Sequence, residues 1–299
     1  MSIAELLVPD FALIALGFLL RRYGGFADEF WRGLERFVYY ILFPALLFGA
    51  LARGGIRFGA AGGLIATALI FTSAGIVLGY LAKPLFSPPK MVFASGFQCA
   101  FRFNSYVGLA ILGTMHGLDG IAVFGLLVGV MIPVANVVAV WALAHHGDGR
   151  LWGELARNPL IVSTLAGIAW ALFGLPVPTI ASTTLHFLGE AALPIGLIAV
   201  GAGLHLEALT ERKRLMSYLV AVKLLAVPAV GYVTARAFGL TGVYFDSALV
   251  LAALPTASSA YILATQMKGD GRLVASVIAL NIVAAIVTLP FWLAMRAGT

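Results

Sequence analysis

The stretch Gly96-Phe-Gln-Cys-Ala-Phe-Arg-Phe-Asn-Ser-Tyr-Val-Gly-Leu-Ala110 interrupts a long apolar segment with polar side chains. Four of them stand near its middle: Gln98, Arg102, Asn104 and Ser105. A charge near the centre of a bilayer costs about 3 kcal/mol on insertion scales, so it usually faces a partner or a wet cavity. Arg102 therefore either pairs with Glu190 or snorkels to an interface, or it attracts a substrate carboxylate beside a local unwinding at 103–105.

A second stretch, Leu251-Ala-Ala-Leu-Pro-Thr-Ala-Ser-Ser-Ala-Tyr-Ile-Leu-Ala264, has a proline inside its apolar segment. Pro255 has no N–H and clashes with the preceding turn, which frees carbonyls near Leu251. The hydroxyls of Thr256, Ser258 and Ser259 stand close enough in sequence to satisfy them. The alternative is an ordinary proline kink packed against its neighbours.

The composition of the whole chain is that of a membrane protein. Of its 299 residues, 61% are hydrophobic and 11% charged, and the mean hydropathy is +1.00. Long apolar runs recur with charges in the gaps between them, as in helices surrounded by lipid. The net charge of +6 is spread over short loops, so membrane topology explains it better than nucleic-acid binding does.

The single cysteine and the N-terminal residues exclude several further features of the protein. The single Cys99 excludes an internal disulfide and a multi-cysteine metal site, and we expect neither a cofactor nor a metal. Glu5 and Asp10 precede the first basic residue, Arg21, so the N-terminus lacks the positive region of a cleavable signal peptide. The first apolar segment is therefore predicted to be a retained span.

Apolar runs of about 20 residues predict an all-α membrane protein with ten transmembrane helices. The predicted spans are 3–20, 34–52, 59–82, 91–115, 121–144, 159–175, 180–204, 215–238, 244–267 and 273–295. Loops after the odd-numbered spans hold thirteen Lys and Arg residues, whereas the other side holds four, at positions 53, 57, 236 and 296. This asymmetry predicts that both termini lie outside the cytoplasm.

The polar residues 147–158 form a predicted amphipathic linker between two halves, 1–146 and 159–299. Because each half has five spans, the halves run in opposite orientations, and any similarity between them makes an inverted repeat. Three pairs of landmarks support this repeat: Pro44 with Pro194, Asn104 with Pro255, and Pro133 with Pro290. Broken, crossing helices 4 and 9 would present half-helix N-termini to an anion near the membrane midplane.

The predicted substrate site lies at this crossing. Its residues are Arg102, Asn104, Ser105, Tyr106, Pro255, Ser258 and Ser259, with Phe103 and Tyr261 as further apolar walls. Four other intramembrane residues are candidates for proton or ion coupling: Glu190, Lys223, Asn136 and Asn281. Each also has a structural alternative. Glu190 pairs with Lys223 or His186, and Lys223 pairs with a carboxylate or with a helix C-terminus. The two asparagines form hydrogen bonds between helices.

The motifs resemble those of the auxin efflux carrier family, which includes bacterial malonate and malate carriers and plant PIN-type exporters. The resemblance is carried by 103–110, by Asn158-Pro-Leu-Ile and Leu175-Pro-Val-Pro, and by 254–264. It implies a five-plus-five inverted repeat and a dimerising scaffold of spans 1, 2, 6 and 7. A transport domain of spans 3–5 and 8–10 would move as an elevator, with its substrate site at Asn104 and Pro255.

The chain also departs from the PIN-type pattern. Ser258 and Ser259 stand where those exporters have a further proline-rich step, and their long cytoplasmic loop is absent. Arg102 favours a compact carboxylate such as malonate or another dicarboxylate, and an exporter of aromatic, auxin-like acids is the alternative. Sodium/bile-acid symporters share a related fold in outline, so sodium coupling stays open.

We therefore expect an organic anion transporter in a bacterial inner membrane, working as a homodimer among lipids. An intramembrane protease is excluded because Asp119 and Asp246 lie at span edges and His145 and His146 in a loop. An ion channel is disfavoured because the sequence has no filter-like motif. A receptor that binds but does not transport is a remaining alternative.

Overall fold

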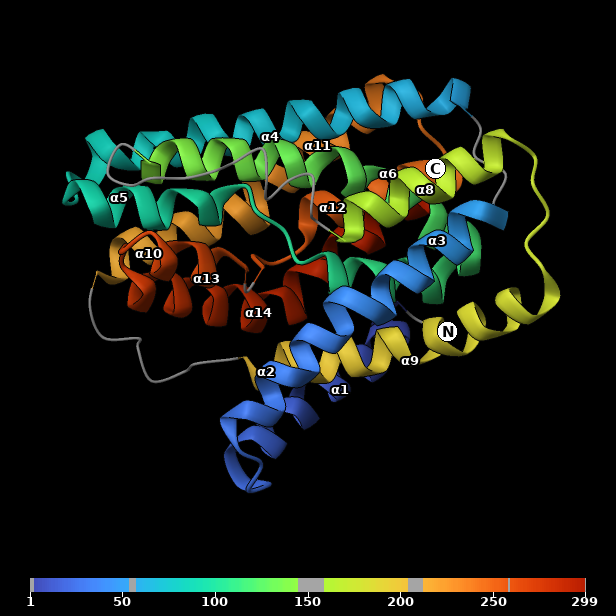
Figure 1. The fold of residues 1–299 in the computed structure, drawn as a ribbon. Helices are drawn as coiled ribbons and strands as arrows, with labels where there is room; N and C mark the ends of the chain where they lie inside the picture. Colours follow the sequence, from blue (N-terminus) through green and yellow to red (C-terminus); the bar gives the residue numbers. More distant parts are fainter. Residues whose placement is uncertain (1–2, 54–57, 145–158, 204–211, 258, 299) are drawn as a thin grey trace. The chain divides into compact units, whose positions relative to one another are not determined.

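The computed structural model describes residues 3–53, 58–144, 159–203, 212–257 and 259–298, and this part of the chain contains helices and no strand (Figure 1). The predicted all-α class is confirmed. In the described ranges, five helical segments are long and apolar enough to cross a membrane: Ala61–Phe86, Lys90–Leu143, Thr179–Ala202, Lys213–Ala237 and Gly271–Ala294. A sixth apolar helix, Gly242–Ala253, is shorter.

The chain divides into two compact units, each assembled from three separate stretches. The first unit comprises residues 1–61, 106–130 and 152–203, and the second comprises 62–105, 131–151 and 204–299. The predicted amphipathic linker, 147–158, lies outside the described residues. The two stretches that interrupt helices, near Arg102 and near Pro255, both belong to the second unit.

Helices pack closely in the first unit. Its elements include α1 (Ile3–Tyr23), α2 (Asp28–Phe37), α3 (Phe43–Arg53), α8 (Pro159–Leu172) and α9 (Thr179–Ala202). Helix α9 packs on α1 and α3, and α3 also packs on α8. A Cβ at Gly17 would collide with the carbonyl of Ile198, and one at Gly201 with that of Ile14. Small residues thus allow the backbones of α1 and α9 to touch.

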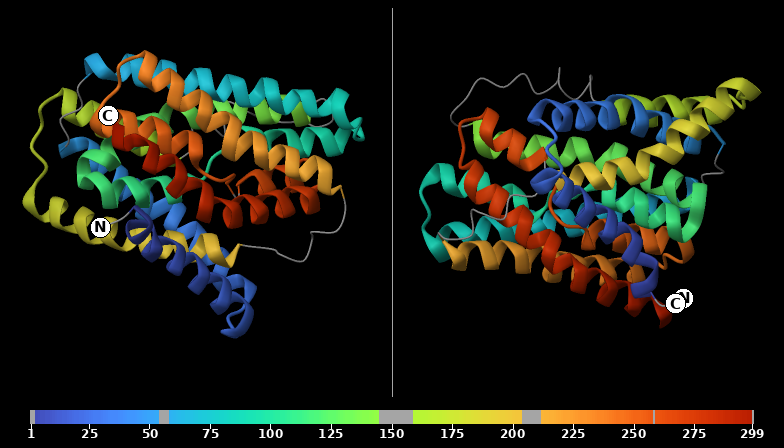
Figure 2. Two further views of the ribbon diagram at one scale, coloured as in Figure 1. Left: turned by 180° about the vertical axis from the view of Figure 1, so that it is seen from behind. Right: turned by 90° about the horizontal axis from the view of Figure 1, so that it is seen from below.

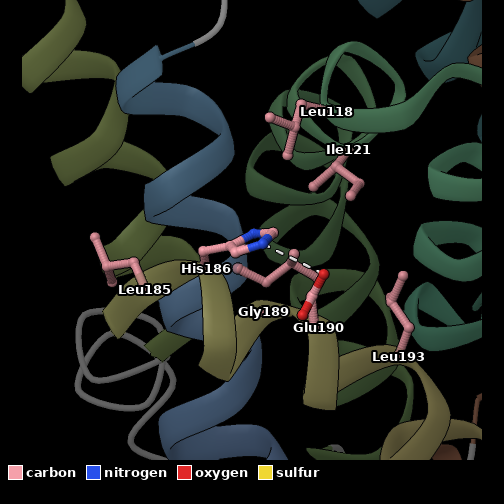
Figure 3. A pocket seen from close by; sticks show the side chains of 8 residues that line it. Leu118, Ile121, Leu185, His186, Gly189, Glu190 and Leu193 are labelled. Carbon is pink, nitrogen blue, oxygen red and sulfur yellow. Dashed lines mark ion pairs between the residues drawn. The ribbon is translucent and has the colours of Figure 1, made fainter. Parts of the chain in front are cut away.

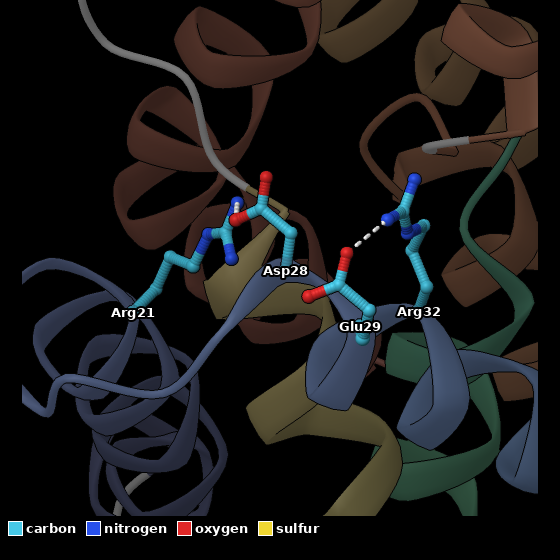
Figure 4. A network of polar contacts seen from close by, with 4 residues as sticks. All are labelled: Arg21, Asp28, Glu29 and Arg32. Carbon is cyan, nitrogen blue, oxygen red and sulfur yellow. Dashed lines mark hydrogen bonds and ion pairs between the residues drawn. The ribbon is translucent and has the colours of Figure 1, made fainter.

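Ion pairs surround the turn between α1 and α2 (Figure 4). Arg21 at the end of α1 contacts Asp28 in the first turn of α2 at 2.7 Å, and Glu29 contacts Arg32 at the same distance. Asp28 and Glu29 also lie where the helix dipole favours negative charge. All four side chains are accessible to solvent, so these pairs contribute little stability, on the order of 0–1 kcal/mol each.

The second unit is organised around α14 (Gly271–Ala294), which packs against α5 (Lys90–Phe97), α10 (Lys213–Ala221), α12 (Gly242–Ala253) and α13 (Ser259–Gln266) (Figure 1, Figure 2). Helix α11 (Val227–Ala237) packs on α12. Helix α4 (Phe58–Phe86) joins this unit through the Tyr218 hydroxyl, which donates to the carbonyl of Leu78 at 2.7 Å.

Two helices contain a π-helical turn two residues before a proline. Val38–Leu42 precedes Pro44, and Val222–Ala226 precedes Pro228. Proline cannot donate a bond to the carbonyl four residues earlier, and a π turn changes that pairing without ending the helix. For Pro228 this carbonyl belongs to Leu224, and it accepts the indole N–H of Trp292 at 2.8 Å.

Helix α6 (Ser105–Ala144) includes a change of direction. Gly117 has φ 59° and ψ −139°, a conformation outside the helical region that L-residues with a Cβ rarely adopt. The residues assigned to predicted spans 4 and 5 meet at this glycine. The structure places residues 106–130 of α6 in the first unit and the residues from 131 onward in the second.

Candidate functional site

The first interruption separates α5 from α6. Helix α5 ends at Phe97, a 3₁₀ turn covers Gln98–Ala100, and residues 101–104 are not helical before α6 begins at Ser105. The Gln98 carbonyl accepts the N–H groups of Phe101 and Arg102, at 3.3 and 3.0 Å. Helix α4 packs tightly here, because a Cβ at Gly75 would lie 2.8 Å from the carbonyl oxygen of Ala100.

The second interruption separates α12 from α13. Helix α12 ends at Ala253, residues 254–257 are not helical, and α13 begins at Ser259. The last helical bond runs from the N–H of Leu254 to the carbonyl of Val250, at 2.9 Å. Pro255 follows and offers no N–H to Leu251, so the helix stops where the sequence removes a donor.

Backbone and hydroxyl groups join the two interruptions directly. The N–H of Asn104 donates to the carbonyl of Pro255 at 2.8 Å, and the hydroxyl of Thr256 donates to the carbonyl of Cys99 at 2.8 Å. Asn281 on α14 donates to the same Thr256 hydroxyl at 3.0 Å. Each interrupted segment therefore provides hydrogen-bond partners for backbone groups of the other. Such partners are necessary within a membrane, where water cannot supply them.

Arg102 lies beside this junction and is almost fully buried, at 8% accessible. Its guanidinium donates to the side-chain oxygens of Gln98 at 3.2 Å, Asn136 at 2.8 Å and Ser259 at 3.1 Å. These three oxygens are uncharged, and they come from the first interruption, from α6 and from the start of α13. Instead of a partner in Glu190, the structure gives this guanidinium neutral acceptors within the second unit.

The predicted substrate residues are divided between the two units. Arg102, Asn104, Ser105, Pro255 and Ser259 all belong to the two interruptions or to the helix starts that follow them. Tyr106 instead groups with the first unit, where its ring packs on Phe43 with centroids 4.4 Å apart. Ser258 lies outside the described residues.

The predicted coupling residues differ in their surroundings. The Lys223 ammonium donates to the carbonyl of Ala252 at 2.8 Å, at the C-terminal end of α12. Asn136 binds Arg102, and Asn281 binds Thr256. The Asn281 side-chain oxygen is buried and has no hydrogen-bond partner among the described residues.

Glu190 lies in the first unit, at a small apolar pocket (Figure 3). It forms an ion pair with His186 at 3.3 Å, one turn away on α9, and both side chains are more than half accessible. Leucine and isoleucine side chains, including Leu118, Ile121 and Leu193, form most of the pocket lining. Among Arg102, Lys223 and His186, the described structure shows His186 in an ion pair with Glu190.

Two residues at the junction have roles that the sequence did not reveal. Gln98 accepts from Arg102 and donates to the carbonyl of Ala260 at 3.2 Å, so it connects both interruptions. Thr256 was expected to satisfy a carbonyl of its own helix but donates to Cys99 instead. The spacing of four residues between Gln98 and Arg102 was a usable signal for the first role, because in a continuous helix it would place both on one face.

Comparison with known proteins points to transport. Residues 148–293 match the model of a family described as "Membrane transport protein". A Rhizobium meliloti (strain 1021) protein named "Putative malonate transporter" is 28% identical, covering 89% of this chain and 87% of its own length. An "Uncharacterized transporter" of Methanothermobacter thermautotrophicus is 24% identical, covering 98% of both chains.

Plant proteins match over a shorter stretch. "Probable auxin efflux carrier component 1b" of Oryza sativa subsp. japonica is 28% identical over 150 residues, which cover 48% of this chain and 27% of the rice protein. The resemblance predicted from the motifs in spans 4, 6 and 9 is confirmed by these matches.

Proposed function

We propose that this chain, a membrane transport protein related to the auxin efflux carriers, is a secondary transporter of small organic anions. The substrate class that we favour is a compact dicarboxylate such as malonate. The anion would bind where the two interrupted helices are joined, beside Arg102. No enzymatic role is proposed.

The observation that carries this proposal is the bonding of Arg102. The guanidinium is buried, and the side-chain oxygens of Gln98, Asn136 and Ser259 that accept its hydrogen bonds belong to uncharged groups that an anion can displace. A carboxylate would gain a bidentate, charge-assisted pair by replacing some of these acceptors. Helices α6 and α13 both begin at the interruptions, and their N-terminal dipoles favour negative charge as well.

We further propose the arrangement in which this site moves. Ten spans would form a five-plus-five inverted repeat, with both termini outside the cytoplasm of a bacterial inner membrane. Spans 1, 2, 6 and 7 would form a dimeric scaffold, and spans 3–5 and 8–10 would carry the substrate across as an elevator. The support is the asymmetry of loop charges and the paired landmarks of the two halves.

Flux through liposomes tests the function. Purified protein, reconstituted with internal unlabelled malonate, should take up labelled malonate from outside in a saturable way. Such counterflow requires alternating access, so neither a receptor nor an open channel should produce it. Repeating the uptake with sodium replaced by choline, and with an imposed pH gradient, identifies the coupling ion.

A pair of variants links that flux to the site. Arg102→Gln removes the charge but keeps a polar side chain, and uptake should be lost. Arg236→Gln removes an accessible arginine at the end of α11 in the same unit and should leave uptake unchanged. Undiminished counterflow in Arg102→Gln would refute the proposed site, and absence of counterflow in the unaltered protein would refute the function.

A further inference from the structure

Lys223 is the most deeply buried charged side chain in the described part of the second unit, at 1% accessible. It projects from the π-helical turn Val222–Ala226, and its ammonium donates to the carbonyl oxygen of Ala252 at 2.8 Å. That carbonyl belongs to the last turn of α12, directly before the interruption at 254–257. A buried ammonium therefore caps the C-terminal end of an interrupted helix.

This helix end has an electrostatic consequence for the neighbouring site. The last carbonyls of a helix carry the equivalent of about half a negative charge, and here Pro255 also removes the donor for Leu251. Residues 248–254 are at most 1% accessible, so water does not screen that partial charge. An anion bound at the junction would be repelled by the end of α12 unless a cation neutralised it.

We propose that Lys223 is a positioning residue that sets the charge of the anion site without touching the substrate. Its ammonium neutralises the C-terminal end of α12 and holds the carbonyl of Ala252 in place. The dipoles of α6 and α13 and the guanidinium of Arg102 are then left to act on the anion. The inference rests on the proposed function, because it concerns the affinity of the same site.

A charge effect can be separated from a hydrogen-bond effect by two neutral variants. Lys223→Met keeps the length of the side chain but removes both the charge and the donor. Lys223→Gln removes the charge but keeps an N–H donor for the carbonyl of Ala252. If the charge matters, both variants should weaken anion binding, whereas a purely structural hydrogen bond would be preserved in Lys223→Gln.

The charge of the ligand provides the decisive readout. Coulomb energy is proportional to ligand charge. The fold increase in Kd for a dianion should therefore be the square of the fold increase for a monoanion of the same size. We expect the Kd of malonate to rise about tenfold, equivalent to about 1.4 kcal/mol, and that of its monoamide about threefold. Binding to detergent-purified protein is measured by calorimetry at low ionic strength.

Two further variants serve as controls. Lys90→Met removes an accessible lysine at the start of α5 in the same unit and should leave both Kd values unchanged. Lys223→Arg retains the charge and should bind both anions within about twofold of the unaltered protein.

The outcomes are distinct. Wild-type affinity in Lys223→Gln, or an equal loss for malonate and its monoamide, would overturn the proposal. If Lys223→Met does not give monodisperse protein, Lys223→Gln and Lys223→Arg still decide, because loss of malonate binding in the arginine variant contradicts a role for charge. If the unaltered protein binds neither anion, the proposed function fails before the role of Lys223 is reached.

Discussion

The two interrupted helices meet at one junction but use their buried cations differently. At the first interruption, the guanidinium of Arg102 bonds to the side chains of Gln98, Asn136 and Ser259. At the second, the ammonium of Lys223 bonds to the backbone carbonyl of Ala252. Side-chain oxygens can rotate away, whereas a helix carbonyl cannot leave its place. Arg102 is therefore suited to exchange its partners for an anion, and Lys223 is suited to remain fixed.

The largest effect expected from this difference concerns Arg102. Arg102→Ala should weaken malonate binding by about a hundredfold or more, because hydrogen bonds between charged groups contribute about 1.5 to 3 kcal/mol each. Calorimetry on purified protein measures the loss, and size-exclusion profiles check folding. Arg236→Ala is the matched control on the surface of the same unit. Retained affinity in Arg102→Ala would mean that Arg102 does not bind the anion.

A smaller effect is expected for the hydroxyl that joins the two interruptions. Thr256→Val keeps the side-chain shape but deprives the Cys99 carbonyl and the Asn281 amide of their partner, at a cost of about 1 to 2 kcal/mol of stability. A lowered Tm in detergent would record this loss. Thr67→Val is the control, because the buried Thr67 hydroxyl has no partner among the described residues. Equal Tm values for the two variants would mean that the junction is not held by Thr256.

Asn104→Ala should have a milder effect on affinity. The bond from residue 104 to Pro255 uses the backbone N–H and persists in alanine, so the junction should stay intact. The lost amide side chain should raise the Kd of malonate about five- to tenfold, the equivalent of one hydrogen bond. Uptake assays should show the same shift in KM. Unchanged kinetics would remove the Asn104 side chain from the proposed site.

The smallest effect is expected outside both interruptions. Glu190→Gln breaks an accessible pair with His186, which contributes little stability. Its uptake rate should match that of the unaltered protein between pH 6 and 8, within about twofold. A changed pH dependence in this variant would instead place proton coupling in the first unit.

Both interruptions lie where polar residues or a proline occur within an apolar run, so their positions could be predicted from the sequence. Pro255 lacks a donor, and the segment from Arg102 to Ser105 crowds polar groups that a continuous lipid-facing helix would not hold. The partners of these groups were harder to predict. Charge alone made Glu190 the expected counter-ion for Arg102, yet Gln98, Asn136 and Ser259 accept its hydrogen bonds. Gln98 is four residues away, but Asn136 and Ser259 are 34 and 157 residues away in the sequence.

The sequence by itself determined that this chain is an apolar, helical membrane protein, since hydropathy and charge spacing are local properties along the chain. Only the tertiary structure decided which groups form hydrogen bonds with the free backbone groups of the two interruptions. The carbonyl of Pro255 meets the N–H of Asn104, and that of Ala252 meets Lys223. Hydrogen bonds act over about 3 Å, so their partners depend on how distant helices pack and not on position in the sequence.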